Sequence, residues 1–250
     1  PWKFYINTIL ATILQVNYPE KSYLIKKIRR FYYLCFIAGK TLNGIKQTSF
    51  NIIAGIANNQ SKEEIEQLME DYMNKNNIKE IVLENLNSEY VYGQKWLKPV
   101  LMSLDYELND IQYFIQIDKT INIDHILPLE YKKDKDWEYI DDSKAENLIN
   151  SLGNMAILSE VKNKSALNKG FKIKINLYQG LKENGEEYSE NEKQKRFTNF
   201  STTRRIINEY NMKEIGKAKN PKFHKLWDTD LIMSRKEDFL LPKIKTMLEI

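Results

Sequence analysis

The stretch Ile121-Asn122-Ile123-Asp124-His125-Ile126-Leu127-Pro128 is where the pattern of the sequence changes. Its β-branched run is typical of a short strand, and the proline ends it. A second short strand is predicted over residues 154–158, after the turn-prone Gly153, and a short helix follows Ser159 and stops at Gly170. The sequence therefore predicts the order strand, loop, strand, helix between residues 120 and 171.

On both sides of this stretch the pattern is helical. Ser61 and Glu64 form a capping-box pattern ahead of apolar residues at helical spacing. Similar apolar stripes run through residues 21–38 and 96–104, and residues 188–210 and 231–248 are also predicted to be helical. We expect a mainly α fold, with a helical bundle or connector over residues 1–110 and a second domain over residues 111–250 that holds the strand–strand–helix unit.

The composition excludes several classes of protein. Nine glycines and six prolines in 250 residues are too few for a β-sandwich or barrel that turns every ten residues. The single cysteine, Cys35, rules out an internal disulfide, and two histidines are too few for a zinc site of the usual Cys/His spacing. No apolar run approaches the roughly 20 residues of a membrane span, so we expect a soluble, cytoplasmic protein. The net charge of +4 permits binding to a polyanion without requiring it.

Residues capable of chemistry lie on three successive predicted elements. Asp124 and His125 lie on the first strand, Asn154 opens the second, and Asn163 lies on the helix nine positions later. This order resembles the HNH, or ββα-metal, nuclease motif. The fold expected from the resemblance is a small ββα-metal hairpin–helix unit embedded among helices.

The flanking sequence narrows the resemblance. The "HILP" strand at 125–128, the "LGN" turn at 152–154 and the helix with Asn163, Asn168 and Phe171 look like the C-terminal nuclease domain of GmrSD-type modification-dependent restriction endonucleases and related phage-defence proteins. The likeness covers roughly residues 90–250. It implies a metal-dependent DNA endonuclease acting in restriction or phage defence. It also implies an N-terminal NTPase or sensor domain that is missing from this chain, and a homodimer is compatible with cutting both strands.

The resemblance assigns a role to each position. It implies that Asp124 and Asn163 hold Mg²⁺ or Mn²⁺, since a carboxylate and an amide carbonyl are the hard oxygen donors that these ions prefer. His125, whose reference pKa is about 6.5, would be the base that takes a proton from water, and Asn154 would orient the histidine strand. The final position of the motif is Asn163, whereas the name of the motif has histidine there. Asparagine also occurs at this position in other HNH domains.

The sequence leaves two questions open. Adjacent strand residues point to opposite faces, so the strand must end or bulge if Asp124 and His125 are to serve one phosphate. The lysines on and after the predicted helix either contact DNA phosphates or form a solvated face, and Asn168 either binds phosphate or only ties down the loop. The candidate DNA contacts are Lys162, Lys164, Asn168, Lys169 and Lys172, and Lys174 belongs to the same run. The alternative function is a catalytically silent helical module that binds DNA or a partner; His224 is assigned no role.

Overall fold

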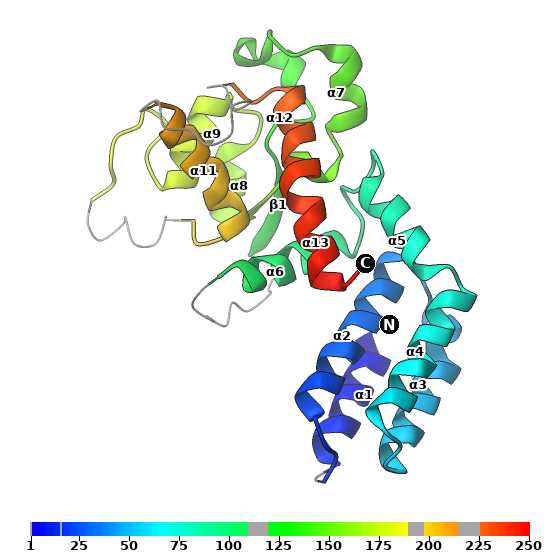
Figure 1. Cartoon of the computed structure of the whole chain (residues 1–250). Helices are drawn as coiled ribbons and strands as arrows, with labels where there is room; N and C mark the ends of the chain where they lie inside the picture. Colours follow the sequence, from blue (N-terminus) through cyan, green and yellow to red (C-terminus); the bar gives the residue numbers. More distant parts are fainter. Residues whose placement is uncertain (1, 16, 110–119, 190–197, 215–225) are drawn as a thin grey trace. The chain divides into compact units, whose positions relative to one another are not determined.

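The computed structural model describes residues 2–15, 17–109, 120–189, 198–214 and 226–250. The described chain is mainly helical, as expected, and has one small antiparallel sheet (Figure 1). It divides into two compact units, Pro1–Asn87 with Leu248–Ile250, and Ser88–Met247. None of the described helices is both long and apolar enough to span a membrane.

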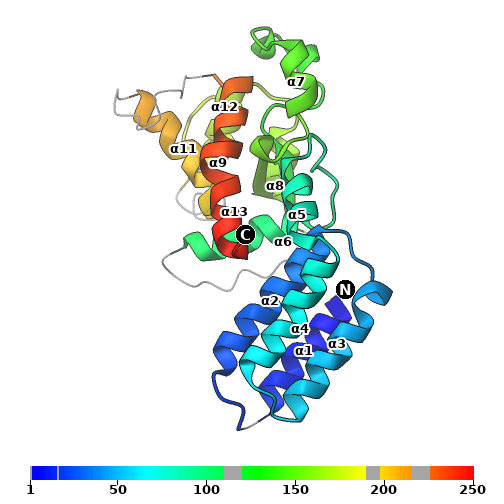
Figure 2. The ribbon, with the colours of Figure 1, turned by 45° about the vertical axis from the view of Figure 1, so that its right-hand side comes forward.

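The first unit consists of helices that bury one apolar face each. The helices are α1 (Trp2–Leu14), α2 (Lys21–Ile37), α3 (Leu42–Ala57), α4 (Lys62–Lys75) and α5 (Ile78–Asn87). The apolar stripe predicted for α2 is buried against its neighbours, and the Tyr32 hydroxyl in its middle is hydrogen-bonded to Thr8 and Ser49. Figure 2 shows α1 to α4 lying side by side. The chain's last residues join this unit, where the carbonyl of Leu248 accepts a hydrogen bond from the Arg30 guanidinium.

The capping box predicted at the start of α4 is present. The Ser61 hydroxyl accepts a hydrogen bond from the main-chain N–H of Glu64, and the Glu64 carboxylate accepts one from the main-chain N–H of Ser61. These bonds satisfy two donors that a bare helix start would leave unpaired.

The second unit holds the sheet and the remaining helices. In chain order the elements are α6 (Leu97–Leu108), β1 (Ile121–His125), the 3₁₀ turns η1 (Tyr131–Lys133) and η2 (Lys135–Trp137), α7 (Asp142–Leu148), the 3₁₀ turn η3 (Leu152–Asn154), β2 (Met155–Ser159), α8 (Glu160–Ala166), α9 (Phe171–Gln179), α11 (Ser201–Glu214), α12 (Thr229–Ser234), the π-helical segment η4 (Arg235–Leu240) and α13 (Leu241–Leu248). The segments α12, η4 and α13 follow one another as one long helical rod (Figure 1). The core of this unit gathers apolar side chains from β2, α9, α11 and α12 together with Trp137 and Trp227.

The predicted strand–strand–helix order is confirmed. β1 pairs with β2 in antiparallel register, with Ile121 opposite Ser159 and His125 opposite Met155. α8 begins directly after β2 and packs against both strands. The strands differ from the prediction by one residue at their ends, because Asn154 lies in the turn η3 and not in β2.

Other elements differ more. The segment 130–146, read from the sequence as a charged loop, contains two 3₁₀ turns and the start of α7. Helix α9 was not predicted at all, although Phe171, Ile175 and Tyr178 fall on one buried face of it. Of the helix predicted over 188–210, the described part begins at Ser201, and residues 190–197 lie outside the described chain, as does His224.

Candidate functional site

His125 is the last residue of β1, and its imidazole is 8% exposed. Its Nε2 lies 3.0 Å from Oδ1 of Asn150, and its ring lies 4.1 Å from the ring of Tyr92, centroid to centroid. Burial lowers the pKa of His125 below its ordinary value of 6.5, and the hydrogen bond to Asn150 opposes that shift. The imidazole is therefore held neutral near pH 7, which is the state that can accept a proton.

Asp124, one residue earlier, is 6% exposed and faces α9. Its carboxylate accepts hydrogen bonds from Nζ of Lys174, at 3.0 and 3.3 Å, and from the hydroxyl of Tyr178, at 2.5 Å. Burial raises the pKa of Asp124 and lowers the pKa of Lys174, while their mutual attraction opposes both shifts. Asp124 is thus one half of a buried ion pair.

The side chains of Asp124 and His125 have different partners. Asp124 is bound by α9, whereas His125 contacts Tyr92 and Asn150. The strand keeps regular pairing up to His125 and then ends. The sequence led us to expect an ending or a bulge that would bring the two side chains to one phosphate. The strand instead ends only after His125, and the two side chains follow the ordinary alternation of a strand.

Asn154 is fully buried, and both the oxygen and the nitrogen of its side-chain amide are hydrogen-bonded within the protein. Its Oδ1 accepts hydrogen bonds from the main-chain N–H of Leu127 and from Nε1 of Trp227, and its Nδ2 donates to the carbonyls of Leu127 and Ile149, at distances of 2.8 to 3.1 Å. With every donor and acceptor bonded to protein, the Asn154 side chain shapes the segment that follows His125 and does not itself offer a group to a substrate.

Gly153 precedes Asn154 at a point of close approach. A Cβ at this position would lie 2.0 Å from the main-chain oxygen of Ile232 on α12. The sequence predicts a glycine suited to a turn at this position. In the structure, glycine is required at position 153 because no side chain fits between η3 and α12.

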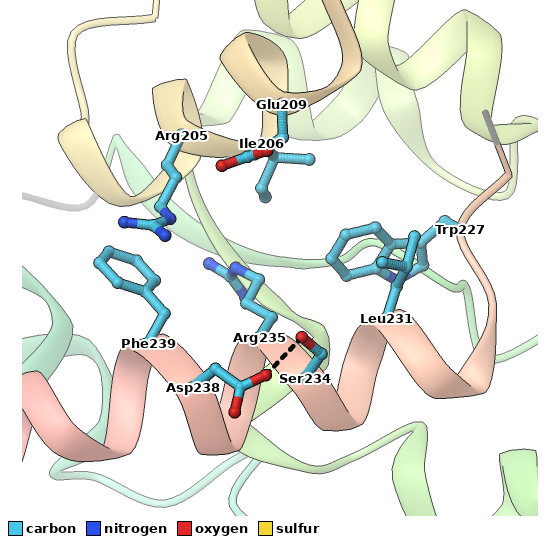
Figure 3. Close-up of a pocket in the computed structure, with 9 residues that line it drawn as sticks. All are labelled: Arg205, Ile206, Glu209, Trp227, Leu231, Ser234, Arg235, Asp238 and Phe239. Atoms are coloured by element: carbon cyan, nitrogen blue, oxygen red, sulfur yellow. Dashed lines mark hydrogen bonds between the residues drawn. The ribbon is translucent and has the colours of Figure 1, made fainter. Parts of the chain in front are cut away.

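Arg235, on the π-helical segment η4, forms hydrogen bonds with the same turn η3. Its Nη1 donates to the carbonyls of Gly153 and Met155, at 2.7 and 2.8 Å. Its Nε and Nη2, together with Oε2 of Glu209, have no hydrogen-bond partner within the described chain, and all three groups border a cavity of about 50 Å³ (Figure 3). Beside it the Arg205 guanidinium stacks on the ring of Phe239, 4.1 Å from its centroid. A cavity of this size has room for a few water molecules.

The residues proposed to contact DNA lie in different environments. Lys162 is 8% exposed, donates to Thr198 and to the carbonyl of Tyr178, and burial lowers its pKa to about 7. Its ammonium is therefore not offered to a phosphate in this arrangement. The remaining candidates are at least partly exposed, but several have acidic neighbours: Lys164 pairs with Glu160, Lys169 with Glu183, and Asn168 donates to Glu130, while Lys172 is exposed on α9.

A family model described as GmrSD restriction endonucleases, C-terminal domain, matches residues 57–239 of this chain. The chain belongs to this family. Membership implies a nuclease effector domain of restriction systems, whose substrate is DNA. Searches among curated proteins and among solved structures found no match.

Nucleases of the GmrSD family usually depend on a metal ion, and Asp124 and Asn163 are the residues predicted to bind it. Asn163 lies on α8 with its side chain partly exposed, and its amide oxygen is a suitable donor. Asp124 is not suitable as it stands, because Lys174 and Tyr178 already occupy its carboxylate. In the described part of the chain, no three His, Cys, Asp or Glu side chains are grouped so that they could hold a metal. The predicted pair does not fit a divalent cation in this arrangement.

The sequence did not point to four residues that contact the candidate site residues. Lys174 and Tyr178 bind Asp124, while Asn150 and Tyr92 contact His125. A signal existed for the first two, since Lys174 and Tyr178 are four residues apart on a helix and so share a face with Phe171. Asn150 and Tyr92 lie in irregular segments, and no periodicity points to them.

Proposed function

We propose that this chain is a DNA endonuclease of the HNH type, in which His125 is the general base for hydrolysis of a phosphodiester bond. The observation that carries the proposal is the position of His125. A buried imidazole ends the first strand of a β1–β2–α8 unit, in a chain that belongs to a restriction endonuclease family. Asn154 lies at the end of the turn η3, directly before β2, and Asn163 lies on α8, in the order that the HNH resemblance requires.

The hydrogen bond to Asn150 supports Nδ1 of His125 as the nitrogen that reacts. With Nε2–H donating to Oδ1 of Asn150, the lone pair of His125 lies on Nδ1. In the proposed reaction, a water molecule gives its proton to Nδ1 while its oxygen bonds to phosphorus. The bond from phosphorus to the 3′ oxygen breaks, and that oxygen takes a proton from solvent, which leaves 5′-phosphate and 3′-hydroxyl ends.

Dependence on Mg²⁺ or Mn²⁺ is part of the proposal and rests on the family. Asn163 as a metal ligand stays a prediction, and so does Asp124, against which the ion pair with Lys174 weighs. The proposed reaction therefore contains no step at a metal ion. A sensor domain on the N-terminal side, a homodimer and DNA contacts by Lys164, Asn168, Lys169 and Lys172 also stay predictions.

The proposal is tested by incubating supercoiled plasmid with the purified protein in Mg²⁺, in Mn²⁺ and in EDTA. The expected result is conversion to nicked or linear DNA that needs the metal and is lost in His125→Ala. His224→Ala is the matched control, because it removes the other histidine of the chain, and it should cut like the parent. Cutting by His125→Ala at the parent rate would refute the role of His125.

A catalytically silent module that binds DNA or a partner is the second candidate, and the ion pair that occupies Asp124 favours it. This candidate predicts DNA binding that is indifferent to Mg²⁺ and to His125→Ala, without conversion of the plasmid. The same samples, run in a gel-shift assay, separate the two functions.

A further inference from the structure

Lys174 is the most deeply buried charged residue beside the candidate base. Its side chain has no exposed surface, and it lies on α9 with Nζ directed at the end of β1. Nζ contacts Asp124 Oδ2 at 3.0 Å, Asp124 Oδ1 at 3.3 Å and the carbonyl oxygen of His125 at 2.5 Å. These three acceptors match the three N–H donors of an ammonium group, so Lys174 is fully satisfied where it lies.

The Asp124 carboxylate also has all its close contacts with protein donors. Besides the bonds from the ammonium, it accepts a hydrogen bond from the hydroxyl of Tyr178, one helical turn after Lys174. The carboxylate therefore has a cation and a strong neutral donor, both from α9, and solvent reaches it very little. Two buried opposite charges in contact leave no net charge that would attract a further ion.

A divalent cation on Asp124 would conflict with this arrangement. The ion would be a double positive charge within a few ångströms of the Lys174 ammonium, in a buried place where water cannot screen the repulsion. The Asp124 carboxylate can thus be the partner of Lys174 or of a metal ion, but not of both at once.

We propose that Lys174 is the resident cation of this site: it, and not a divalent metal ion, neutralises Asp124, and it positions His125 by holding that residue's carbonyl. Asp124 then serves as the anchor of Lys174. The neutralising role stands on the geometry alone, whereas the positioning role rests on the proposed function, in which His125 is the base.

The pair is tested first by thermal unfolding. Lys174→Met and Asp124→Asn each remove one partner, so each lowers Tm, because each leaves a buried charge without its counter-charge. The double variant should lose less Tm than the sum of the two single losses, because no unpaired charge remains. Lys182→Met, at an exposed lysine after α9, is the control and should keep the parent Tm. Additive losses in the double variant would overturn the proposal.

Metal binding is tested by titrating Mn²⁺ and following its electron paramagnetic resonance signal, without DNA. The proposal expects folded Asp124→Asn to bind Mn²⁺ within about twofold of the parent, since Asp124 does not hold the ion. Absence of binding to both proteins agrees with it as well, because no ion then lies on Asp124. Binding that is at least tenfold weaker in folded Asp124→Asn than in the parent would overturn it.

The positioning role is tested by cleavage kinetics on the double variant, which keeps the buried site uncharged. Loss of the Lys174 bond to the His125 carbonyl should lower kcat at least tenfold and leave KM within about twofold, because the base is displaced and DNA binding is not affected. An unchanged kcat would overturn this part. If the parent itself does not cut DNA, the proposed function has failed, while the unfolding and Mn²⁺ measurements still decide whether Lys174 is the cation of Asp124.

Discussion

The side-chain amide of Asn154 forms two hydrogen bonds with the main chain of Leu127, accepting its N–H and donating to its carbonyl, each at 2.8 Å. The amide thereby takes the place of a neighbouring strand just beyond the end of β1. It fixes the course of the chain two residues after His125, and Gly153 and Arg235 fix the turn in which Asn154 lies.

Asn154→Asp should destabilise the protein strongly. The substitution keeps the shape but replaces the amide donors by an oxygen, which then faces the carbonyls of Leu127 and Ile149 in a fully buried place. We expect a loss of at least about 2 kcal/mol of unfolding free energy. Urea unfolding measures it, with Asn211→Ala at an exposed position as the control. Equal midpoints for the two variants would show that the Asn154 bonds do not matter.

Gly153→Ala should be costly for a steric reason. The added methyl would overlap the main-chain oxygen of Ile232, so α12 or the turn η3 must move. Overpacking of this kind costs about 1–3 kcal/mol. A thermal scan checks it, and Gly39→Ala separates this effect from that of backbone conformation, since Gly39 has a φ of +71° but open space around it. Unchanged stability of Gly153→Ala would mean that the close approach is absent in solution.

The pH dependence of the cleavage rate should follow the protonation of His125. Burial lowers the pKa of His125, the neighbouring Lys174 adds to this, and Asn150 and Asp124 oppose it. Because only the neutral imidazole can take a proton, kcat falls as the pH drops through this pKa, so the acid limb has its midpoint below 6.5.

Asn150→Ala should move that limb to still lower pH. The bond to Oδ1 of Asn150 favours the protonated imidazole, so its loss lowers the pKa of His125 further. The same change frees the ring and should reduce kcat about tenfold, the equivalent of one hydrogen bond of about 1.4 kcal/mol. A pH–rate profile of both proteins is the measurement. An acid limb at the same pH in both would contradict the contact with Asn150.

Ser61→Ala tests the first unit separately. It removes the acceptor for the Glu64 main-chain N–H at the start of α4 and should cost about 1 kcal/mol of stability. Plasmid cleavage should stay at the parent rate, because no residue of the candidate site lies in Pro1–Asn87. Cleavage lost in a fully folded Ser61→Ala would assign the first unit a part in the reaction.

Local patterns were sufficient to predict much of this molecule from its sequence. The capping box at Ser61, the stripe of α2 and the strand at residues 121–125 each depend on neighbours within a few residues. His125 and Asn154 are predicted as site residues because the HNH motif has a fixed order along the chain, and their roles stay predictions. The structure shows that Asn154 bonds the main chain of Leu127, while its orienting role in a reaction stays a prediction.

The environment of Asp124 could not be predicted in the same way. Lys174 lies fifty residues from Asp124, and in a lysine-rich stretch it has the appearance of one more solvated charge. Lys162 has the same appearance and is also buried. Which lysines turn inward is decided by tertiary contacts with β1 and with Thr198, and a single sequence does not contain them.

Single-turnover cleavage of an end-labelled duplex by the parent and by His125→Ala, with and without added imidazole, tests the central claim most directly. We predict that His125→Ala is slower by about 10²–10⁴-fold and that imidazole restores part of the rate, since a free base can then take the proton from water. Cleavage by His125→Ala at the parent rate, unaffected by imidazole, would contradict the assignment of His125 as the base.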